Sequence, residues 1–402
     1  MFQLLKGITI VDLSSVMLGP FASHLLADLG ATVIKIESPE GDIFRYAGPA
    51  RHQGMGAGYL NVNRNKQSLA LNLKTQTGRD TIKKLIEKAD VLLHNMRPDA
   101  VERLGIRYED VSVINKNIIY CAAVGFGGDG PYANEPAYDD IMQAVSGFAS
   151  LAKTSNTPPS FAPTVLADKI AGLYAALGIL SGLFQRERTG QGAAVEAPMF
   201  ESMVSFLLAE HLSGHSFQPP KGPMGYGRLT TSYRRPYKTS DGYIAVMPYS
   251  TKHWERILTL LEREDLAKTN WVRDASLRSE RIGELYQIVA ESMPYKKTSQ
   301  WLQVLKSLDI PCGPINTLPD LLNDAHLRAV NFFQKINHPT EGALISMRHP
   351  LRFIGATTES DMPAPIHGQD GVEILLTAGF DQETIKSLVE CGALILPDQN
   401  LG

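Results

Sequence analysis

The chain has little cysteine and no long hydrophobic run. Its 3 cysteines, Cys121, Cys312 and Cys391, are far apart in 402 residues. No Cys-x-x-Cys pair occurs, which argues against zinc-finger and disulfide frameworks. The sequence also lacks the roughly 18 consecutive apolar residues of a membrane span, and its start lacks the apolar core and cleavage site of a signal peptide. We therefore expect a cytoplasmic protein with no membrane segment and no structural metal.

An excess of one charge is also missing. Lys and Arg number 39 and Asp and Glu number 42, which gives a net charge of −3. This balance offers no broad basic surface for nucleic acid or for an anionic membrane. Hydrophobic residues make up 44% of the chain and charged residues 20%, as in ordinary globular enzymes with a large core. The length suggests two or three domains, or one large domain with an insertion.

Strand and helix patterns alternate in the first part of the chain. Residues 8–13 and 31–36 are apolar strand-like runs, and a helical pattern over 21–29 lies between them, ending at Gly30. A further helix is predicted at 77–88, and further strands at 68–73, 91–93 and 118–124. This alternation predicts an α/β fold with a parallel sheet and helices on both faces.

The pattern changes after about residue 200. Gly and Pro cluster over 214–227, as in a linker or an active-site loop, and 233–248 has the pattern of a hairpin. Helical stretches follow to about residue 325, then a strand-like run at 333–336 and a final helix. We predict a large domain from 1–200 with 332–402, a linker or lid at 201–227, and a small α+β domain at 228–331.

A glycine-rich run resembles a dinucleotide-binding motif. Residues 125–130 match G-x-G-x-x-G and follow a predicted strand, and Glu37 mimics the acid that binds ribose. However, Pro131 follows directly and no helix pattern opens there, so the helix N-terminus that holds pyrophosphate is missing. We therefore expect no NAD site, and we expect these glycines to let the backbone approach a bulky group.

Three other patterns are ambiguous or weak. His211 and His215 have metal-ligand spacing, but no acid lies between them and Gly214 weakens the helix, so we expect no metal site. No G-x-S-x-G or P-loop occurs. The polar, basic run 61–66 fits either a solvated loop or phosphate contacts, and composition does not decide between them.

Asp168 is the only acid between residues 162 and 180, and it heads a run of small and apolar residues. Two explanations apply. An acid near a helix start can satisfy free N–H groups and the helix dipole. Alternatively, the helix N-terminus keeps a carboxylate ionised in an apolar site, where it can act as a nucleophile. On this stretch alone the cap is favoured, because caps are common.

Several segments, taken together and in order, resemble the class III CoA-transferases, the CaiB/BaiF family. The resemblance covers most of the first two hundred residues and then weakens, with a later echo at 241–243. It is carried by Gly19-Pro20-Phe21-Ala22, 26–31, 33–37, 63–66, 125–132, Tyr138-Asp139, 143–147, and Ala167-Asp168 with 171–174.

The resemblance implies site residues. Asp168 would be the catalytic nucleophile, and 225–227 (Gly225, Tyr226 and Gly227) are our candidate lid. Contacts to CoA are implied for Met17, Leu71, Lys74, Asn95, Met96, Arg97, Arg103, Tyr138 and Asp139. The formyl-CoA transferase branch is similar but has Gln where this chain has Met17 and Arg where it has Ser38, which puts formate and oxalate as substrates in doubt.

The resemblance also implies an activity and an assembly. The family exchanges CoA between an acyl-CoA and a free carboxylic acid through a mixed anhydride and an aspartyl-CoA thioester, with no cofactor beyond CoA as substrate and product. The implied fold is an interlocked homodimer with a Rossmann-like large domain and a smaller α+β domain. The sequence does not name the acids; Arg45, Arg228, Arg234 and Arg235 are candidate cations for a dicarboxylate.

Two alternatives remain. The 2-methylacyl-CoA racemases are similar in fold, but their catalytic His falls where this chain has Tyr138, and tyrosine is a poor base near neutral pH. The other alternative is a protein that binds CoA without chemistry. An acid retained at Asp168 argues against it, since a protein without catalysis would tolerate an apolar residue there.

Overall fold

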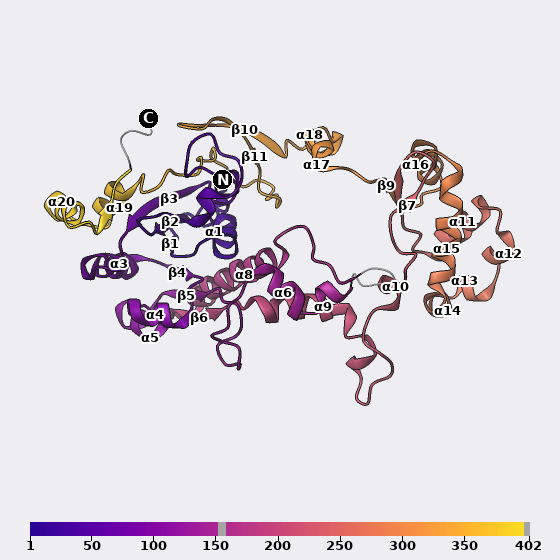
Figure 1. The fold of residues 1–402 in the computed structure, drawn as a ribbon, viewed down its shortest axis with the longest axis horizontal. Helices are drawn as coiled ribbons and strands as arrows, with labels where there is room; N and C mark the ends of the chain where they lie inside the picture. Colours follow the sequence, from indigo (N-terminus) through magenta and orange to yellow (C-terminus); the bar gives the residue numbers. More distant parts are fainter. Residues whose placement is uncertain (152–157, 398–402) are drawn as a thin grey trace. The chain divides into compact units, whose positions relative to one another are not determined.

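The computed structural model of the protein describes residues 1–151 and 158–397. The chain divides into two compact units. Unit 1 comprises Met1–Ser150, Pro159–Phe206 and Ala329–Gly402, and unit 2 comprises Leu207–Arg328 with Leu151 and Pro158. Both ends of the chain therefore contribute to unit 1 (Figure 1).

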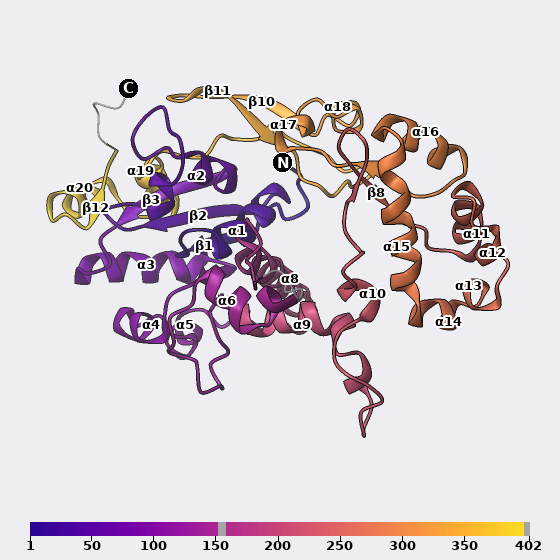
Figure 2. The ribbon, with the colours of Figure 1, turned by 45° about the vertical axis from the view of Figure 1, so that its right-hand side comes forward.

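Unit 1 is built on a seven-stranded sheet in the order β12-β3-β2-β1-β4-β5-β6. The pairs from β3 to β6 are all parallel, whereas β12 pairs antiparallel with β3 at the edge (Figure 2). The α/β class is confirmed, but the sheet is mixed rather than purely parallel. The strands are β1 (Thr9–Asp12), β2 (Thr32–Glu37), β3 (Lys66–Leu71), β4 (Val91–His94), β5 (Ile119–Ala122), β6 (Ala193–Glu196) and β12 (Leu394–Ile395).

Helices cover both faces of this sheet, because side chains alternate between the faces along each strand. On one face, Leu69 and Tyr120 share a core with residues of α3 (Gln76–Lys88), α4 (Pro98–Leu104), α5 (Tyr108–Ile114), α19 (Gly371–Thr377) and α20 (Gln382–Glu390). On the other face lie α1 (Leu18–Asp28) and α8 (Leu166–Thr189) (Figure 2).

Glycines set the close packing of α8. A Cβ at Gly172 would lie 2.8 Å from the carbonyl oxygen of Leu18 in α1, and one at Gly182 would lie 2.8 Å from the side chain of Ile119 in β5. By length and hydropathy α8 would also fit a membrane span. Its small residues are, however, buried in unit 1, which is the pattern of a core helix.

The rest of unit 1 consists of short elements and a hairpin. The strands β10 and β11 pair antiparallel from Phe333 to Met347. These elements are α2 (Ala57–Val62), α6 (Asp139–Val145), α7 (Phe148–Leu151), α9 (Met199–His211), α18 (Ala325–Ala329), β10 (Phe333–His338) and β11 (Gly342–Met347), of which α7, α9 and α18 also include residues of unit 2.

Unit 2 packs helices on a small antiparallel sheet. The predicted hairpin is confirmed, since β7 pairs with β8, and a third strand, β9, interrupts the region expected to be helical. Trp254, Tyr286 and Trp301 are buried in its core. Its elements are α10 (Gly227–Thr230), β7 (Tyr237–Lys238), β8 (Tyr243–Val246), α11 (Thr251–Leu260), α12 (Glu264–Ala267), α13 (Asn270–Arg273), α14 (Ala275–Glu280), α15 (Ile282–Ser292), α16 (Thr298–Ser307), β9 (Cys312–Pro314) and α17 (Leu318–Leu321).

Candidate active site

The strand order of unit 1 reverses at β1. From β1 the chain adds β2 and β3 on one side, and then β4, β5 and β6 on the other. In open α/β sheets, ligands bind beyond the carboxyl ends of the strands at such a switch point. Two neighbouring cavities lie there, and both are lined by Ser15, which follows β1, and Met96, which follows β4.

The first cavity, here called the carboxylate cavity, has a volume of about 330 Å³. Loops after β1, β4 and β5 line it, together with the starts of α6 and α8. It brings together six of the residues implied by the resemblance, from segments far apart in the sequence: Asn95, Met96, Arg97, Tyr138, Asp139 and Asp168.

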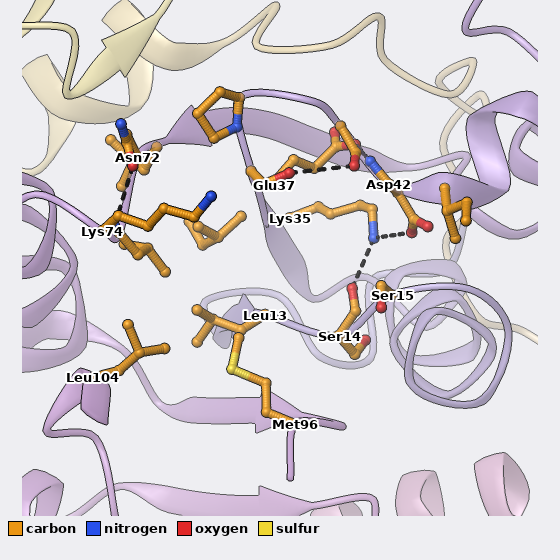
Figure 3. Close-up of a pocket in the computed structure, with 17 residues that line it drawn as sticks. Leu13, Ser14, Ser15, Lys35, Glu37, Asp42, Asn72, Lys74, Met96 and Leu104 are labelled. Atoms are coloured by element: carbon orange, nitrogen blue, oxygen red, sulfur yellow. Dashed lines mark hydrogen bonds and ion pairs between the residues drawn. The ribbon is translucent and has the colours of Figure 1, made fainter. Parts of the chain in front are cut away.

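The second cavity, here called the lysine cavity, has a volume of about 430 Å³. Figure 3 shows the side chain of Lys74 extending into it above Leu13, Met96 and Leu104. Leu71 also lines it. A largely apolar hollow with a cationic side chain suits a flat, anionic ligand group.

Lys35, by contrast, is not available to a ligand in the lysine cavity. Its Nζ donates to the carbonyl oxygen of Ser14 and lies 2.9 Å from the carboxylate of Asp42 (Figure 3). Its side chain is fully buried. Lys35 therefore fixes the loop after β1, and Lys74 is the free cation among the described residues that line this cavity.

Asp168 lies in the first turn of α8, where sequence reasoning expected it. Its backbone N–H donates to Oδ1 of Asp139 at 3.1 Å. Among the described residues, no hydrogen bond or ion pair holds the Asp168 carboxylate itself. Asp168 therefore does not cap its own helix, and its carboxylate oxygens are free toward the carboxylate cavity.

Burial raises the pKa of the Asp168 carboxyl to about 6, and the negative charge of Asp139 adds to this rise, while Lys169 opposes it. The carboxyl is thus mostly ionised at neutral pH, but it is more basic than an ordinary aspartate. A carboxylate in this state is a better nucleophile than a fully solvated one. Cys121, within β5, is not an alternative nucleophile, because it is fully buried and burial raises the pKa of its thiol to about 12.

The loop after β1 is held by side chains from two other segments. Asn95 accepts the N–H of Ser15 at 3.0 Å and donates to the Ser15 carbonyl at 2.9 Å. Asp42 accepts the N–H of Val16 at 3.1 Å. Val16 has a φ of 69°, which is unfavourable for a β-branched residue and persists only where the surroundings impose it.

The remaining residues implied by the resemblance lie elsewhere. Leu71 and Lys74 line the lysine cavity. Met17 precedes α1, between two residues of the carboxylate cavity, but does not line either cavity; Arg103 is exposed and also lines neither. The candidate lid lies in unit 2, where the Tyr226 N–H donates to Nδ1 of His211 at 3.2 Å.

The structure overturns the two interpretations of the basic run 61–66. Asn61 is exposed, but residues 62–66 are buried, and none of the run lines either cavity. Arg64 is buried and bonds to Asp28 of α1, as does Asn65, and Lys66 donates to the Pro20 carbonyl at 2.9 Å. The run anchors β3 to α1.

A buried ion pair corrects one more candidate, Arg45, and accounts for Glu37. Glu37 and Arg45 form a buried pair at 2.7 Å, and this pair holds the pKa of Glu37 at about 2. Glu37 is therefore not free to bind a ribose, and Arg45 is not free to bind a dicarboxylate.

The glycine-rich run opens no helix, as predicted, because the next helix starts at Asp139. Its backbone N–H groups bind protein carboxylates instead of a pyrophosphate: Gly127 donates to Glu201 at 3.0 Å and Gly128 donates to Glu196 at 3.1 Å. A Cβ at Gly125 would lie 2.1 Å from that of Ala137. The group that packs closely against Gly125 is thus Ala137, in the chain segment that leads to α6.

Sequence reasoning missed several residues of the site. Val16, Glu135 and Met199 line the carboxylate cavity, and Asp42 holds its rim. None belongs to a motif, and only the three-dimensional pairing of distant loops identifies them. Within the described residues, no group of three or more His, Cys, Asp or Glu could hold a metal ion.

This geometry agrees with comparisons to known proteins. The model of CoA-transferase family III matches residues 5–371. The chain belongs to CoA-transferase family III. It is therefore an enzyme of a family that transfers CoA between acyl-CoA molecules and carboxylic acids.

The relatives of this family III enzyme differ in their named substrates. The chain is 31% identical to a succinyl-CoA:glutarate CoA-transferase of Homo sapiens over 97% of its own length and 90% of that protein. It is 29% identical to a formyl-CoA:oxalate CoA-transferase of Streptomyces avermitilis, over 98% of its length and 100% of the relative. It is 28% identical to a cinnamoyl-CoA:phenyllactate CoA-transferase of Clostridium sporogenes, over 96% of each chain.

Solved structures share the fold. A CaiB/BaiF family protein from Brucella suis has a TM-score of 0.78 and 30% identity, covering 94% of this chain and 100% of its own. A protein from Mycobacterium tuberculosis has a TM-score of 0.79 and 26% identity, covering 92% of this chain and 98% of its own. The arrangement of this family III enzyme is thus that of the CaiB/BaiF fold.

Proposed function

We propose that this enzyme transfers CoA from an acyl-CoA to a free carboxylic acid with Asp168 as the covalent nucleophile. The observation that carries the proposal is the state of the Asp168 carboxylate. It lines a cavity, has no partner among the described residues, and has a pKa of about 6. Such a group is ionised at neutral pH yet retains its basicity, which nucleophilic attack on a thioester requires.

The reaction proceeds by exchange of acyl bonds. An Asp168 oxygen attacks the thioester carbonyl carbon and the C–S bond breaks. CoA leaves as a thiolate, and Asp168 and the donor acyl group are joined as a mixed anhydride. The thiolate then attacks the aspartyl carbonyl carbon, and the donor acid leaves as a carboxylate. The acceptor carboxylate repeats these steps in reverse and regenerates Asp168. No electron or net proton is transferred, and the overall free energy is near zero because one thioester replaces another.

We propose that CoA spans both cavities. The nucleotide end would occupy the lysine cavity, where Lys74 meets a phosphate, and the pantetheine arm would pass Ser15 and Met96 toward Asp168. These two residues line both cavities, which supports a continuous path. We keep Gly225, Tyr226 and Gly227 as the candidate lid, because a mixed anhydride has to be protected from water.

We further propose an interlocked homodimer in the cytoplasm. The outer face of α8 carries exposed Leu173, Leu177 and Phe184, an apolar stripe that a second copy would cover. The three cysteines form no disulfide bond, which agrees with a reducing compartment such as the cytoplasm. Light scattering after size-exclusion chromatography tests the dimer, and a monomer at micromolar concentration contradicts it.

The test of the mechanism is intact-protein mass spectrometry after incubation with succinyl-, formyl- and cinnamoyl-CoA, for wild type and Asp168→Asn. We expect a CoA-sized covalent adduct on wild type alone, since only a carboxylate can form the thioester. Asp140→Asn, which removes an exposed acid near the site, is the matched control and should form the adduct like wild type.

The other outcomes distinguish the alternatives. If no donor gives an adduct but solvent deuterium enters a 2-methylacyl-CoA, the enzyme is a racemase. If the protein binds CoA in a dialysis assay but shows neither reaction, it is a CoA binder without catalysis. Where wild type does form the adduct, glutarate, oxalate or phenyllactate is added to the labelled enzyme. The acid that removes the adduct is the acceptor.

A further inference from the structure

The helix that carries Asp168 begins without a cap of its own. Val165 occupies the position before α8, and its side chain cannot accept a hydrogen bond. The N–H groups of a first turn need an external acceptor, usually the side chain at that position. Here Oδ1 of Asp139, from the start of α6, accepts the Asp168 N–H at 3.1 Å. Asp139 thus supplies from another helix the cap that Val165 cannot.

Asp139 is itself fixed by Gln143, one turn further along α6. Gln143 is fully buried, and its Nε2 donates to Oδ2 of Asp139 at 2.5 Å. The Oε1 of the same side chain accepts the N–H of Ala162 at 2.8 Å. Gln143 therefore ties the segment before α8 to α6 and at the same time orients Asp139.

The two carboxylates of this cavity consequently differ in role. Asp139 is buried, and each of its oxygens accepts a hydrogen bond, so it is poorly suited to attack a carbonyl. Asp168 has no such partner for its carboxylate among the described residues. We propose that Asp139, oriented by Gln143, is a positioning residue that caps α8 and keeps a negative charge beside the Asp168 nucleophile. This inference rests on the proposed role of Asp168.

The charge of Asp139 has a measurable consequence. Asp168 is flanked by Asp139 of α6, by Lys169 of its own helix, and by Glu135, Tyr138 and Arg97 around the cavity. Lys169 is engaged with the Thr164 hydroxyl at 2.6 Å. Asp139 raises the pKa of Asp168, second only to burial, so its removal should make Asp168 ionise at lower pH.

The experiment measures the single-turnover rate of thioester formation between pH 4.5 and 8 for wild type, Asp139→Asn and the control Asp140→Asn. Asp139→Asn keeps an acceptor for the Asp168 N–H but removes the charge. We expect its acid limb to move down by at most about one pH unit. We also expect its plateau rate to fall about tenfold, because Gln143 loses its acceptor and Asp168 is held less well. Asp140→Asn should leave both unchanged.

A second variant covers the case in which Asp139→Asn does not fold. Gln143→Met keeps the volume and removes the hydrogen bonds, so we expect a lower plateau rate with an unmoved acid limb. A purely structural role of Asp139 predicts that Asp139→Asn loses the same fraction of its rate at every pH and that its acid limb does not shift. That result overturns the inference. A wild-type rate in Gln143→Met, or an acid-limb shift of equal size in Asp140→Asn, overturns it as well. Full activity in Asp168→Asn would instead overturn the proposed function.

Discussion

Asp168 should lower the free energy of unfolding of the protein, and replacing it should therefore stabilise the protein. Its pKa is about 6 in the folded chain and 3.8 in an unfolded one. Folding thus makes ionisation of this carboxyl harder, and at neutral pH the folded state carries the cost of an ionised, partly buried group. Asp168→Asn removes that cost and keeps the backbone N–H bonded to Asp139.

The magnitude follows from the two pKa values. Their difference corresponds to about 3 kcal/mol at about 1.36 kcal/mol per pH unit. Asp168 is partly exposed, so solvent screening reduces the expected gain to about 1–3 kcal/mol. The sign depends on pH. Below pH 3.8 both states of the wild type are protonated and the gain vanishes; it grows as the pH rises through 6 and is constant above.

Urea unfolding of wild type and Asp168→Asn at pH 5, 6, 7 and 8 measures this gain. We expect a higher midpoint for the variant at pH 8, a smaller difference at pH 5, and no thioester formation at any pH. Asp140→Asn, at an exposed position, should match wild type throughout. If Asp168→Asn is no more stable than wild type at pH 8, or if its gain is the same at every pH, the argument from burial is wrong.

Two further predictions concern packing and CoA binding. Gly172→Ala should lower the free energy of unfolding by about 1–3 kcal/mol in urea titrations, because its Cβ would lie 2.8 Å from the Leu18 carbonyl oxygen, whereas Gly222, with nothing within 4 Å, should tolerate alanine much better. Lys74→Ala should weaken CoA binding about tenfold in calorimetry and reduce the salt dependence of that binding, since a phosphate contact is lost. Lys116→Ala, at an exposed position, is the control. Equal affinities of the two variants for CoA would contradict the proposed placement of CoA.

Local patterns predicted much of the sheet, because both strands of the first βαβ unit are short apolar runs and the helix between them ends just before Gly30. The edge strand β12 was not predicted. It has two residues, and it forms only because Leu394 meets Leu71, more than three hundred positions earlier. Pairing over such a distance leaves no periodic signal in the sequence.

The site shows the same limit. Asp168 stands out in the sequence because it is an isolated acid among apolar residues. The role of Asn95 does not stand out in the sequence. Its carboxamide binds the backbone of Ser15, and no pattern around Asn95 or Ser15 indicates that the two residues meet. The basic run ending at Lys66 was misjudged because its partners, Asp28 and Pro20, lie on a helix whose position depends on the whole fold.

The antiparallel edge strand has a consequence for synthesis on the ribosome. During translation, β3 emerges with one edge unpaired, and the core around Leu69 and Leu71 lacks α19, α20 and β12 until the last part of unit 1 arrives. An open, apolar edge invites pairing with another chain. The nascent protein is therefore prone to aggregate from the time β3 is made until Leu394 is available, and its yield in a cell should depend on chaperones during that interval.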